Sequence, residues 1–206
     1  PSRSEGRGKI RPAVLVTKPL PKSCIAALER HYTVHMLVGV PEPDAVLAKH
    51  GAEVRAIAGG KVPRSLMEQL PNLEIIANSG VGVDSIDLNA AQARNIAVTN
   101  TPGVLNDSVA ELAIALMLAL ARSVPQADRF VREGKWQERM FPLRNELSGK
   151  TAGILGLGRI GKEIARRLAA LKMKIVYCGR TKQEDQPYAF ISDPVALAHE
   201  CDWLVV

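Results

Sequence analysis

The sequence predicts an α/β protein built from two parallel-sheet domains, the second of them incomplete within this chain. Through the first hundred residues, short apolar runs alternate with amphipathic helical patterns, which is typical of a parallel sheet with helices on its faces. A second strand–helix–strand pattern covers 151–180. Between the two lies the turn-rich segment from Thr99 to Gly103, where we place the domain boundary.

The composition indicates a folded protein that does not bind nucleic acid. The chain has 206 residues, 47% hydrophobic, which is enough for real cores. Part of the net charge of +6 comes from a basic segment, residues 1–11, that we expect to be a flexible leader. Only 4% of residues are aromatic and no basic stripe is interleaved with them. We therefore expect no nucleic-acid partner.

Cysteine spacing and hydropathy indicate the compartment. Cys24, Cys178 and Cys201 lie too far apart for a disulfide framework or a metal motif, so a reducing cytoplasm is expected. The longest apolar run, 112–121, is too short to span a bilayer. No membrane association is expected.

The first domain is expected to cover 12–100. Pro21 and Ser23 introduce its first helix, with Ile25, Leu28 and Tyr32 facing inward. Ser65 and Glu68 have the spacing of a capping box for the third helix. The predicted strands are 13–17, 33–37, 54–58, 73–77 and 96–98, and the later helices are 43–50, 65–70 and 88–94.

A long helix, 108–122, opens the second domain, 101–206. Ser108 and Glu111 again have capping-box spacing. The stretch 112–121 is apolar on every side, so it is either a central core helix or the surface of a dimer. A longer connection with Trp136, Met140 and Phe141 follows.

The segment 151–180 carries the most specific motif. Gly156, Gly158 and Gly161 have G-x-G-x-x-G spacing between a strand and an amphipathic helix, the context that a dinucleotide site requires. Gly156 permits the tight turn, Gly158 lets a pyrophosphate approach, and Gly161 lets helix and strand pack closely. The N–H groups from Arg159 and Ile160 onward would face the phosphates. A Rossmann-like domain follows from this pattern, with a glycine-rich turn in an ordinary α/β domain as the plainer alternative.

The end of the second strand indicates which dinucleotide binds. An NAD site usually places an acidic residue there, but here Gly179 is followed by Arg180, Thr181 and Lys182, and no acid precedes Glu184. A guanidinium suits a ribose 2′-phosphate. We therefore expect NADP(H) in preference to NAD(H), unless Arg180 is simply a solvated loop residue.

A further buried strand is predicted at 202–206, where the sequence stops. A doubly wound nucleotide domain needs more strands than this. We therefore expect the second domain to be truncated at its C-terminal end.

Four stretches together resemble the D-2-hydroxyacid dehydrogenase family, most closely its glyoxylate/hydroxypyruvate reductase branch. They are Asn78–Asp84, Asn100–Leu105, Val109–Glu111 and Gly156–Gly161, and the Tyr-x-Gly-Arg end at 177–180 adds to them. The resemblance covers the chain after the leader. It implies two flavodoxin- or Rossmann-like domains, 12–100 for substrate and 101–206 for NAD(P), and a homodimer formed around helix 108–122.

The resemblance also assigns the loop 79–82 to the substrate carboxylate, through the N–H groups of Val81 and Gly82. Consecutive amides in a glycine-bearing loop can form an anion-binding nest, although a plain strand-to-helix turn would also need glycine. Asp84 and Asp87 are better interpreted as turn or helix-start residues.

No catalytic residue can be assigned within this chain. The His, Glu and Arg that the family uses would lie beyond Val206, and His31, His35, His50 and His199 are interpreted as surface or packing residues. A bulky residue among Trp136, Met140 and Phe141 could reach a partner's pocket in this family, but a local core role explains them equally well.

The sequence thus predicts NADPH-dependent reduction of small 2-keto acids such as glyoxylate or hydroxypyruvate. The alternatives are an NAD-linked relative with another substrate, a dinucleotide-sensing protein of the corepressor type, and a catalytically inactive domain. A His–carboxylate pair with an upstream Arg beyond Val206 would separate the enzyme from the sensor.

Overall fold

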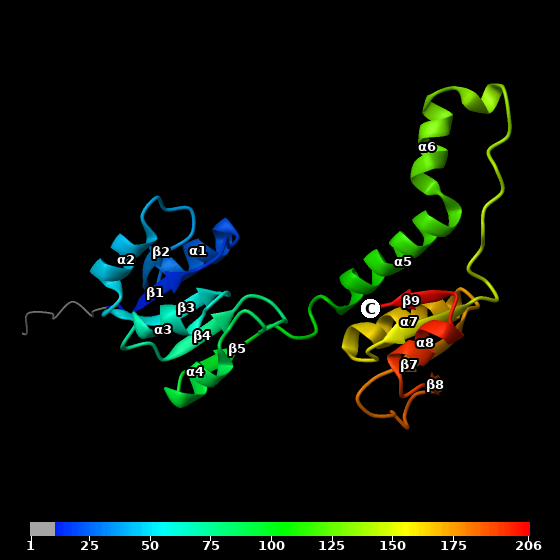
Figure 1. Ribbon diagram of the computed structural model, residues 1–206. Helices are drawn as coiled ribbons and strands as arrows, with labels where there is room; N and C mark the ends of the chain where they lie inside the picture. The colour runs from blue at the N-terminus through cyan, green and yellow to red at the C-terminus, as the bar shows by residue number, and fades with distance from the viewer. Residues whose placement is uncertain (1–10) are drawn as a thin grey trace, which may run out of the picture. The chain divides into compact units, whose positions relative to one another are not determined.

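The computed structural model describes residues 11–206, so residues 1–10 of the predicted leader lie outside the described range. The chain divides into two compact units, with the division between Pro102 and Gly103. Each unit is built around one parallel sheet (Figure 1). The predicted α/β fold class with two parallel sheets is confirmed.

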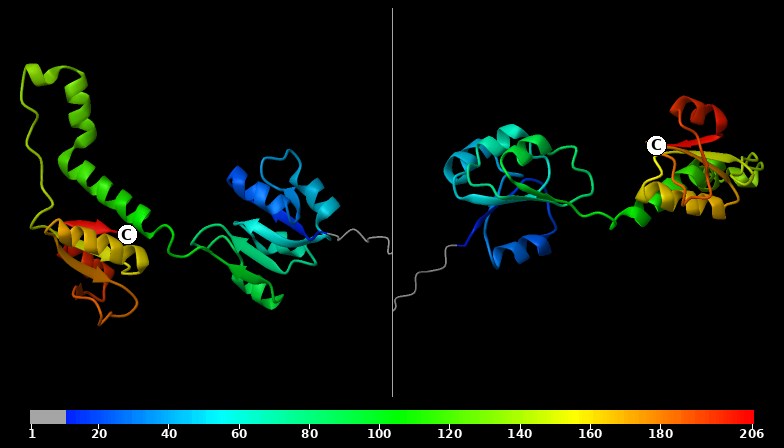
Figure 2. Two further views of the ribbon diagram at one scale, coloured as in Figure 1. Left: turned by 180° about the vertical axis from the view of Figure 1, so that it is seen from behind. Right: turned by 90° about the horizontal axis from the view of Figure 1, so that it is seen from below.

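The first unit has a five-stranded sheet in the order β2-β1-β3-β4-β5. Helix α1 lies on one face, and α2, α3 and α4 lie on the other (Figure 2). The chain changes face after β2 because it reverses direction across the sheet while parallel crossovers keep one hand. The strands are β1 Ala13–Val16, β2 Thr33–Met36, β3 Val54–Gly59, β4 Ile75–Asn78 and β5 Ala97–Thr99, and the helices are α1 Lys22–Glu29, α2 Pro43–His50, α3 Arg64–Glu68 and α4 Leu88–Ala93.

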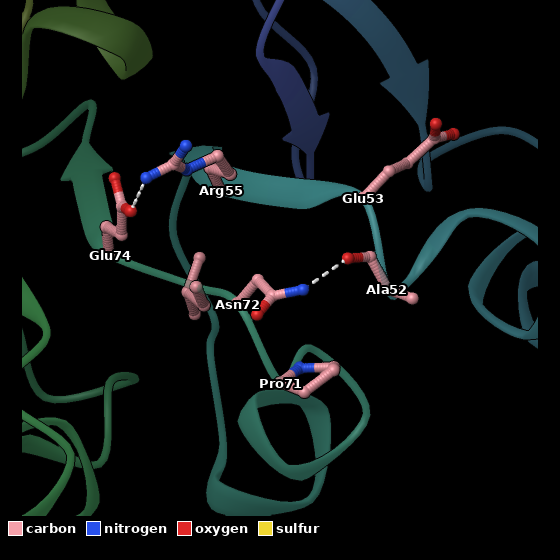
Figure 3. A pocket seen from close by; sticks show the side chains of 7 residues that line it. Ala52, Glu53, Arg55, Pro71, Asn72 and Glu74 are labelled. Carbon is pink, nitrogen blue, oxygen red and sulfur yellow. Dashed lines mark hydrogen bonds and ion pairs between the residues drawn. The ribbon is translucent and has the colours of Figure 1, made fainter.

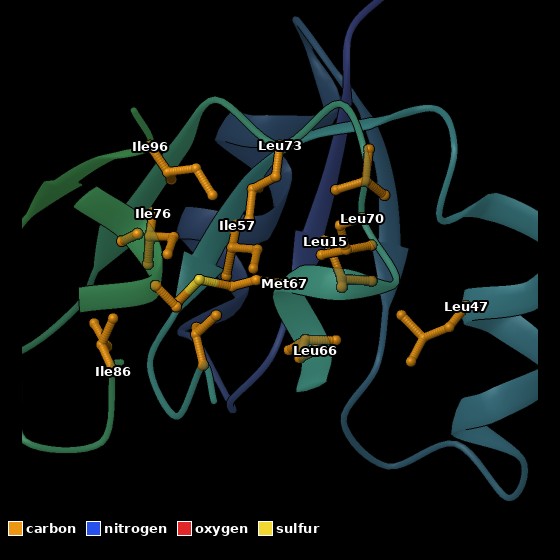
Figure 4. Close-up of a cluster of buried hydrophobic side chains, with 14 of the residues drawn as sticks. Leu15, Leu47, Ile57, Leu66, Met67, Leu70, Leu73, Ile76, Ile86 and Ile96 are labelled. Atoms are coloured by element: carbon orange, nitrogen blue, oxygen red, sulfur yellow. The ribbon is translucent and has the colours of Figure 1, made fainter. Parts of the chain in front are cut away.

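The core of this unit lies between the sheet and helices α2 to α4. Leu15, Ile57 and Ile76 project from three neighbouring strands onto Met67 and Leu70, and all five are fully buried (Figure 4). The loops that follow these strands therefore extend from a packed sheet.

Two local predictions for this unit were wrong. Tyr32 is 39% exposed rather than inward-facing, because α1 ends at Glu29 and Tyr32 lies in the following turn. Helix α3 begins one residue earlier than predicted, with Pro63 as its N-cap and no side-chain cap. Ser65 is therefore inside the helix and cannot form the capping box.

The second unit has a four-stranded sheet in the order β8-β7-β6-β9. Residues alternate between its two faces with the period of a strand. Ile175 and Tyr177 pack in the cluster under α5 and α7, whereas Val176 and Cys178 pack against Leu197 of α8. The elements are α5 Asn106–Arg122, α6 Val124–Arg132, the 3-10 turn Lys135–Gln137, β6 Thr151–Leu155, α7 Arg159–Ala170, β7 Lys174–Cys178, β8 Ala189–Phe190, α8 Pro194–Glu200 and β9 Trp203–Val205.

Helix α5 differs from the prediction at its start. It begins at Asn106 with no side-chain cap, so Ser108 and Glu111 do not form a capping box. It is also buried on one side only within the chain: Ala110, Met117 and Ala121 are buried, whereas Leu112, Leu116 and Leu120 are 59%, 61% and 72% exposed.

Helix α6, which the sequence reasoning did not predict, follows α5 after a left-handed residue, Ser123, with φ +50°. Among the described residues, no single helix combines the length and apolar character needed to cross a bilayer. Only α5 and α6 taken together, bent by 59° at their break, meet those criteria.

Candidate functional site

The glycine-rich turn between β6 and α7 is held by backbone geometry. Gly156 has a φ of +101°, a conformation that side chains rarely allow, and its N–H donates to the Cys178 carbonyl at 2.8 Å. A Cβ on Gly161 would overlap the Gly156 carbonyl oxygen. The first and third glycines are therefore required by the fold itself.

Gly158 differs from the other two, because a Cβ added there would meet no atom within 4 Å. It is the N-cap of α7 and provides no side-chain cap. Within residues 11–206, the N–H groups of Gly158, Arg159 and Ile160 have no acceptor. Unpaired amides at the positive end of a twelve-residue helix suit a phosphate, so the residues present fit the pyrophosphate of a dinucleotide.

A cavity of about 690 Å³ lies against this turn. Gln183 joins its two sides: its Nε2 donates to the Leu157 carbonyl at 2.8 Å, and its backbone N–H donates to the hydroxyl of Tyr177 at 2.7 Å. Tyr177 is fully buried, so the loop after β7 is anchored beside the glycine turn. The lining residues are Leu155–Gly158, Cys178–Thr181, Gln183, Ser192 and Pro194.

The two cationic side chains that follow Gly179 differ in whether they form an ion pair. Arg180 lines it, is exposed, and has no ion pair within the described part of the chain. Lys182 instead pairs with Glu184 at 3.0 Å, and that carboxylate is 80% exposed. The guanidinium of Arg180 is thus available to an anion, whereas the neighbouring ammonium has a carboxylate partner on the surface.

In the first unit, the loop 79–82 after β4 has all four of its carbonyl groups occupied. Side chains donate to them as follows: Lys18 Nζ to Ser79 at 2.6 Å, Asn78 Nδ2 to Gly80 at 3.2 Å and to Gly82 at 2.8 Å, and Asn100 Nδ2 to Val81 at 2.8 Å. The Thr101 N–H also donates to the Gly80 carbonyl at 3.0 Å.

The N–H groups of the same loop are available. Across residues 11–206, the amides of Gly80, Val81 and Gly82 donate to no protein acceptor. Because its carbonyls are hydrogen-bonded to side chains and its amides are free, the loop has the arrangement of an anion-binding nest. A carboxylate is a suitable ligand for it.

Three comparisons bear on this pair of sites. Residues 114–206 match the family model described as D-isomer specific 2-hydroxyacid dehydrogenase, NAD binding domain. The chain is 41% identical over 196 residues to a glyoxylate/hydroxypyruvate reductase A of Arabidopsis thaliana, covering 94% of this chain and 63% of that protein.

Two solved structures are similar throughout. A 2-hydroxyacid dehydrogenase from Ketogulonicigenium vulgare has a TM-score of 0.86 at 41% identity, covering 95% of this chain and 63% of that one. The NADPH-dependent glyoxylate/hydroxypyruvate reductase from Sinorhizobium meliloti, in complex with NADP and malonate, has a TM-score of 0.84 at 40% identity, covering 94% of this chain and 61% of that one.

The chain belongs to the D-2-hydroxyacid dehydrogenase family. Its similarity is to the glyoxylate reductase branch of that family, and the resemblance inferred from its motifs is confirmed. The chain spans 63% of the length of the first curated relatives that it matches.

The predicted cofactor residues of this dehydrogenase-family chain gather in one place. Gly156, Gly158, Gly179, Arg180 and Thr181 line the cavity of the second unit. Two more begin α7 beside it: Arg159 is its first residue and Ile160, half-buried, its second. Val81 and Gly82 lie in the loop of the first unit.

Sequence reasoning missed the residues that support these loops. Asn78 is 6% exposed, the one buried polar side chain among the described residues, and its position at the end of an apolar strand was the available signal. Lys18, Asn100 and Gln183 bond to carbonyls 61, 19 and 26 residues away. Contacts at such separations leave no local pattern.

Asp87 has a structural role, as interpreted from the sequence. Asp87 is the N-cap of α4 and accepts from the Ala90 N–H at 2.8 Å. That hydrogen bond, with Arg64 nearby, lowers the pKa of the Asp87 carboxyl below its usual value. An acid held ionised in this way is poorly suited to give up a proton.

The three bulky residues after α6 have different environments. Phe141 packs edge-on against Phe130, with ring centroids 5.3 Å apart. Trp136 and Met140 are 59% and 85% exposed. The structure thus gives Phe141 a local packing role and leaves the other two on the surface.

Proposed function

We propose that this protein is an NADPH-dependent reductase of small 2-keto acids, with glyoxylate and hydroxypyruvate as its substrates. The observation that carries the proposal is the cavity at the uncapped start of α7, flanked by an unpaired Arg180 and by no carboxylate at that position. Its named relatives include glyoxylate and hydroxypyruvate reductases.

In this proposal residues 12–100 form the substrate-binding domain and 101–206 the NAD(P)-binding domain. Gly158, Arg159 and Ile160 hold the pyrophosphate through their amides. Arg180 and Thr181 hold the 2′-phosphate, since a guanidinium matches phosphate in charge and shape. When bound, NADPH supplies the hydride that reduces the keto carbon.

The substrate carboxylate is held by the amides of Val81 and Gly82. Lys18 and Asn78 donate hydrogen bonds to the loop carbonyls, so that the amides are oriented before the substrate binds. A binding loop that needs no rearrangement loses less free energy on binding. We assign no proton-transfer residue within the described part of the chain.

We also propose that the protein is a cytoplasmic homodimer formed on the exposed apolar face of α5. Leu112, Leu116 and Leu120 make a row of apolar side chains on one helix. Contiguous exposed apolar surface of this kind is typical of protein interfaces. The three unpaired cysteines are compatible with a reducing compartment.

The cofactor assignment is tested by measuring Kd for NADPH and NADH with Arg180→Gln and its matched control Lys182→Gln. Charged hydrogen bonds contribute about 1.5–3 kcal/mol, so R180Q should weaken NADPH binding roughly tenfold or more and leave NADH unchanged. K182Q should change little, because Glu184 already pairs with that lysine. Equal loss for both dinucleotides in R180Q would contradict the proposal.

The substrate assignment is tested by NADPH oxidation with glyoxylate, hydroxypyruvate and pyruvate. We expect the first two to be turned over with the higher kcat/KM. Turnover of pyruvate alone would preserve the family and overturn the substrate choice.

A further inference from the structure

Three potential metal ligands meet in the first unit, away from both sites described above. His35 lies on β2, His50 is the last residue of α2, and Glu53 immediately precedes β3. Oε1 of Glu53 is 3.1 Å from Nε2 of His35 and 2.5 Å from Nδ1 of His50. The ligand atoms of all three lie within 4.8 Å of one another.

Two features of the fold bring these residues together: the order of the strands and the turn after α2. Strand β1 separates β2 from β3 in the sheet, and the turn after α2 is closed by the Glu53 N–H, which donates to the His50 carbonyl at 3.0 Å. The two imidazole rings stack with centroids 4.0 Å apart. A nitrogen of each ring lies within 3.1 Å of the same carboxylate oxygen, Oε1 of Glu53.

The cluster is not a fully satisfied hydrogen-bond network. Nε2 of His35 is buried and has no hydrogen-bond partner, although it lies 3.1 Å from Glu53, because the two groups are not aligned. A buried polar atom without a partner costs free energy. A cation at this point would supply the missing interaction.

We propose that His35, His50 and Glu53 form a binding site for one divalent transition-metal ion of the zinc type. Two imidazoles and a carboxylate are a ligand set that zinc uses with water in the remaining position. Ligands about 2.0–2.2 Å from a tetrahedral ion lie roughly 3.3–3.5 Å apart. The His35–Glu53 separation is close to this. The His50–Glu53 separation needs to widen by about 1 Å, and the two stacked rings, with planes 24° apart, must turn for both nitrogens to point at one ion.

Among the described residues, the ion pairs of the Glu53 carboxylate are with His35 and His50 alone. Glu53 borders an open cavity of about 550 Å³ that also contains Arg55, Asn72 and Glu74. Arg55, the nearest arginine there, is paired with Glu74, and the Glu53 carboxylate points away from that pair (Figure 3). The Glu53 side chain is 54% exposed, so an ion and its water can reach the carboxylate from solvent.

The site is separate from the proposed reaction. Glu53 stands where β3 begins, whereas the loop 79–82 follows the end of β4. In a parallel sheet, all strands begin on one side and end on the other. Glu53 and the loop 79–82 therefore lie at opposite ends of the strands. An ion at this position would therefore stabilise the first unit rather than contact the 2-keto acid.

The test is Zn²⁺ titration of tag-free, chelator-treated protein, by calorimetry and by competition with a chromogenic chelator. We expect one ion per chain, and at least a tenfold loss of affinity in His50→Gln and in Glu53→Gln. His31→Gln and His199→Gln are matched controls, because neither histidine belongs to the cluster, and both should bind as the parent does.

A second measurement protects the test against misfolding. Zn²⁺ should raise the melting temperature of the parent and of His31→Gln but not of His50→Gln, while all three give the same circular dichroism spectrum. Cobalt should give the visible absorption of a four-coordinate ion in the parent. Equal zinc affinity in all the variants, or no stoichiometric binding in the parent, would show that the cluster is only a histidine–carboxylate network and would overturn the proposal.

Discussion

The three glycines of the β6–α7 turn have different physical roles. Gly156 needs its positive φ, Gly161 has no room for a side chain, and Gly158 has open space around it. The motif alone treats the three as equivalent. The structure separates the glycines that the fold requires from the one that leaves space for a ligand.

This difference predicts opposite outcomes for two alanine substitutions. Gly158→Ala should leave the free energy of unfolding unchanged and weaken NADPH binding roughly tenfold or more, because its methyl group would occupy the approach to the phosphate. Gly161→Ala should destabilise the protein by about 1–3 kcal/mol, because the methyl group overlaps backbone. Urea denaturation and fluorescence titration measure both quantities, and unchanged binding in G158A would place the phosphate elsewhere.

Asn78 is a positioning residue whose amide nitrogen serves two loop carbonyls. Replacing it with Asp keeps the size but removes the donor and adds a negative charge beside the proposed carboxylate site. We expect Asn78→Asp to raise KM for glyoxylate roughly tenfold with the Kd for NADPH unchanged. A parallel loss of both affinities would instead indicate general misfolding, which circular dichroism would reveal.

At the scale of elements, the sequence identified most strands and helices, because buried parallel strands and amphipathic helices have strong periodic patterns. Helix α2 has the predicted limits. The short β8 and the helices α6 and α8 were missed: β8 has two residues, and the two helices have nine and seven, fewer than the longer runs in which a helical pattern is easiest to recognise. Capping boxes at Ser65 and Ser108 failed because each helix begins before its serine.

The candidate site was predictable only where it depends on local motifs. The glycines, Arg180 and the loop at Val81 are local signals, whereas the donors that fix those loops come from distant strands and turns. The sequence does not identify His35, His50 and Glu53 as a group. His35 comes close to the other two only when β2 and β3 have assembled on either side of β1.

Helix α5 leads to a prediction about assembly. Its buried side is filled within the chain, and its exposed leucines have no partner among the described residues. Leu116→Glu should convert a dimer to a monomer in light scattering, whereas Val195→Glu on α8, at a site 62% exposed, should not. A parent protein that is itself monomeric would refute the proposed interface.

For the whole molecule, the ionised carboxylates determine how stability changes with pH. Five of them have pKa values lowered below the usual range by hydrogen bonds and nearby cations: Glu53, Asp87, Glu133, Glu163 and Asp185. A group whose pKa is lower in the folded state contributes stability above its unfolded pKa, near 4, and loses it as pH falls through the folded value.

We therefore expect the urea midpoint to begin to fall below about pH 6.5, because burial lowers the pKa of His35, and to fall further below about pH 4 as the carboxylates become protonated. Glu163 gives the sharpest test, because it accepts from Arg166 at 2.8 Å and from Arg167 at 2.5 Å. Glu163→Gln should lower the midpoint at pH 7 and approach the parent at pH 3, since the parent carboxyl is then protonated too. Glu184→Gln, at a side chain 80% exposed, serves as the control and should follow the parent throughout. If the E163Q and parent curves stay parallel down to pH 3, the arginine contacts of Glu163 contribute no pH-dependent stability.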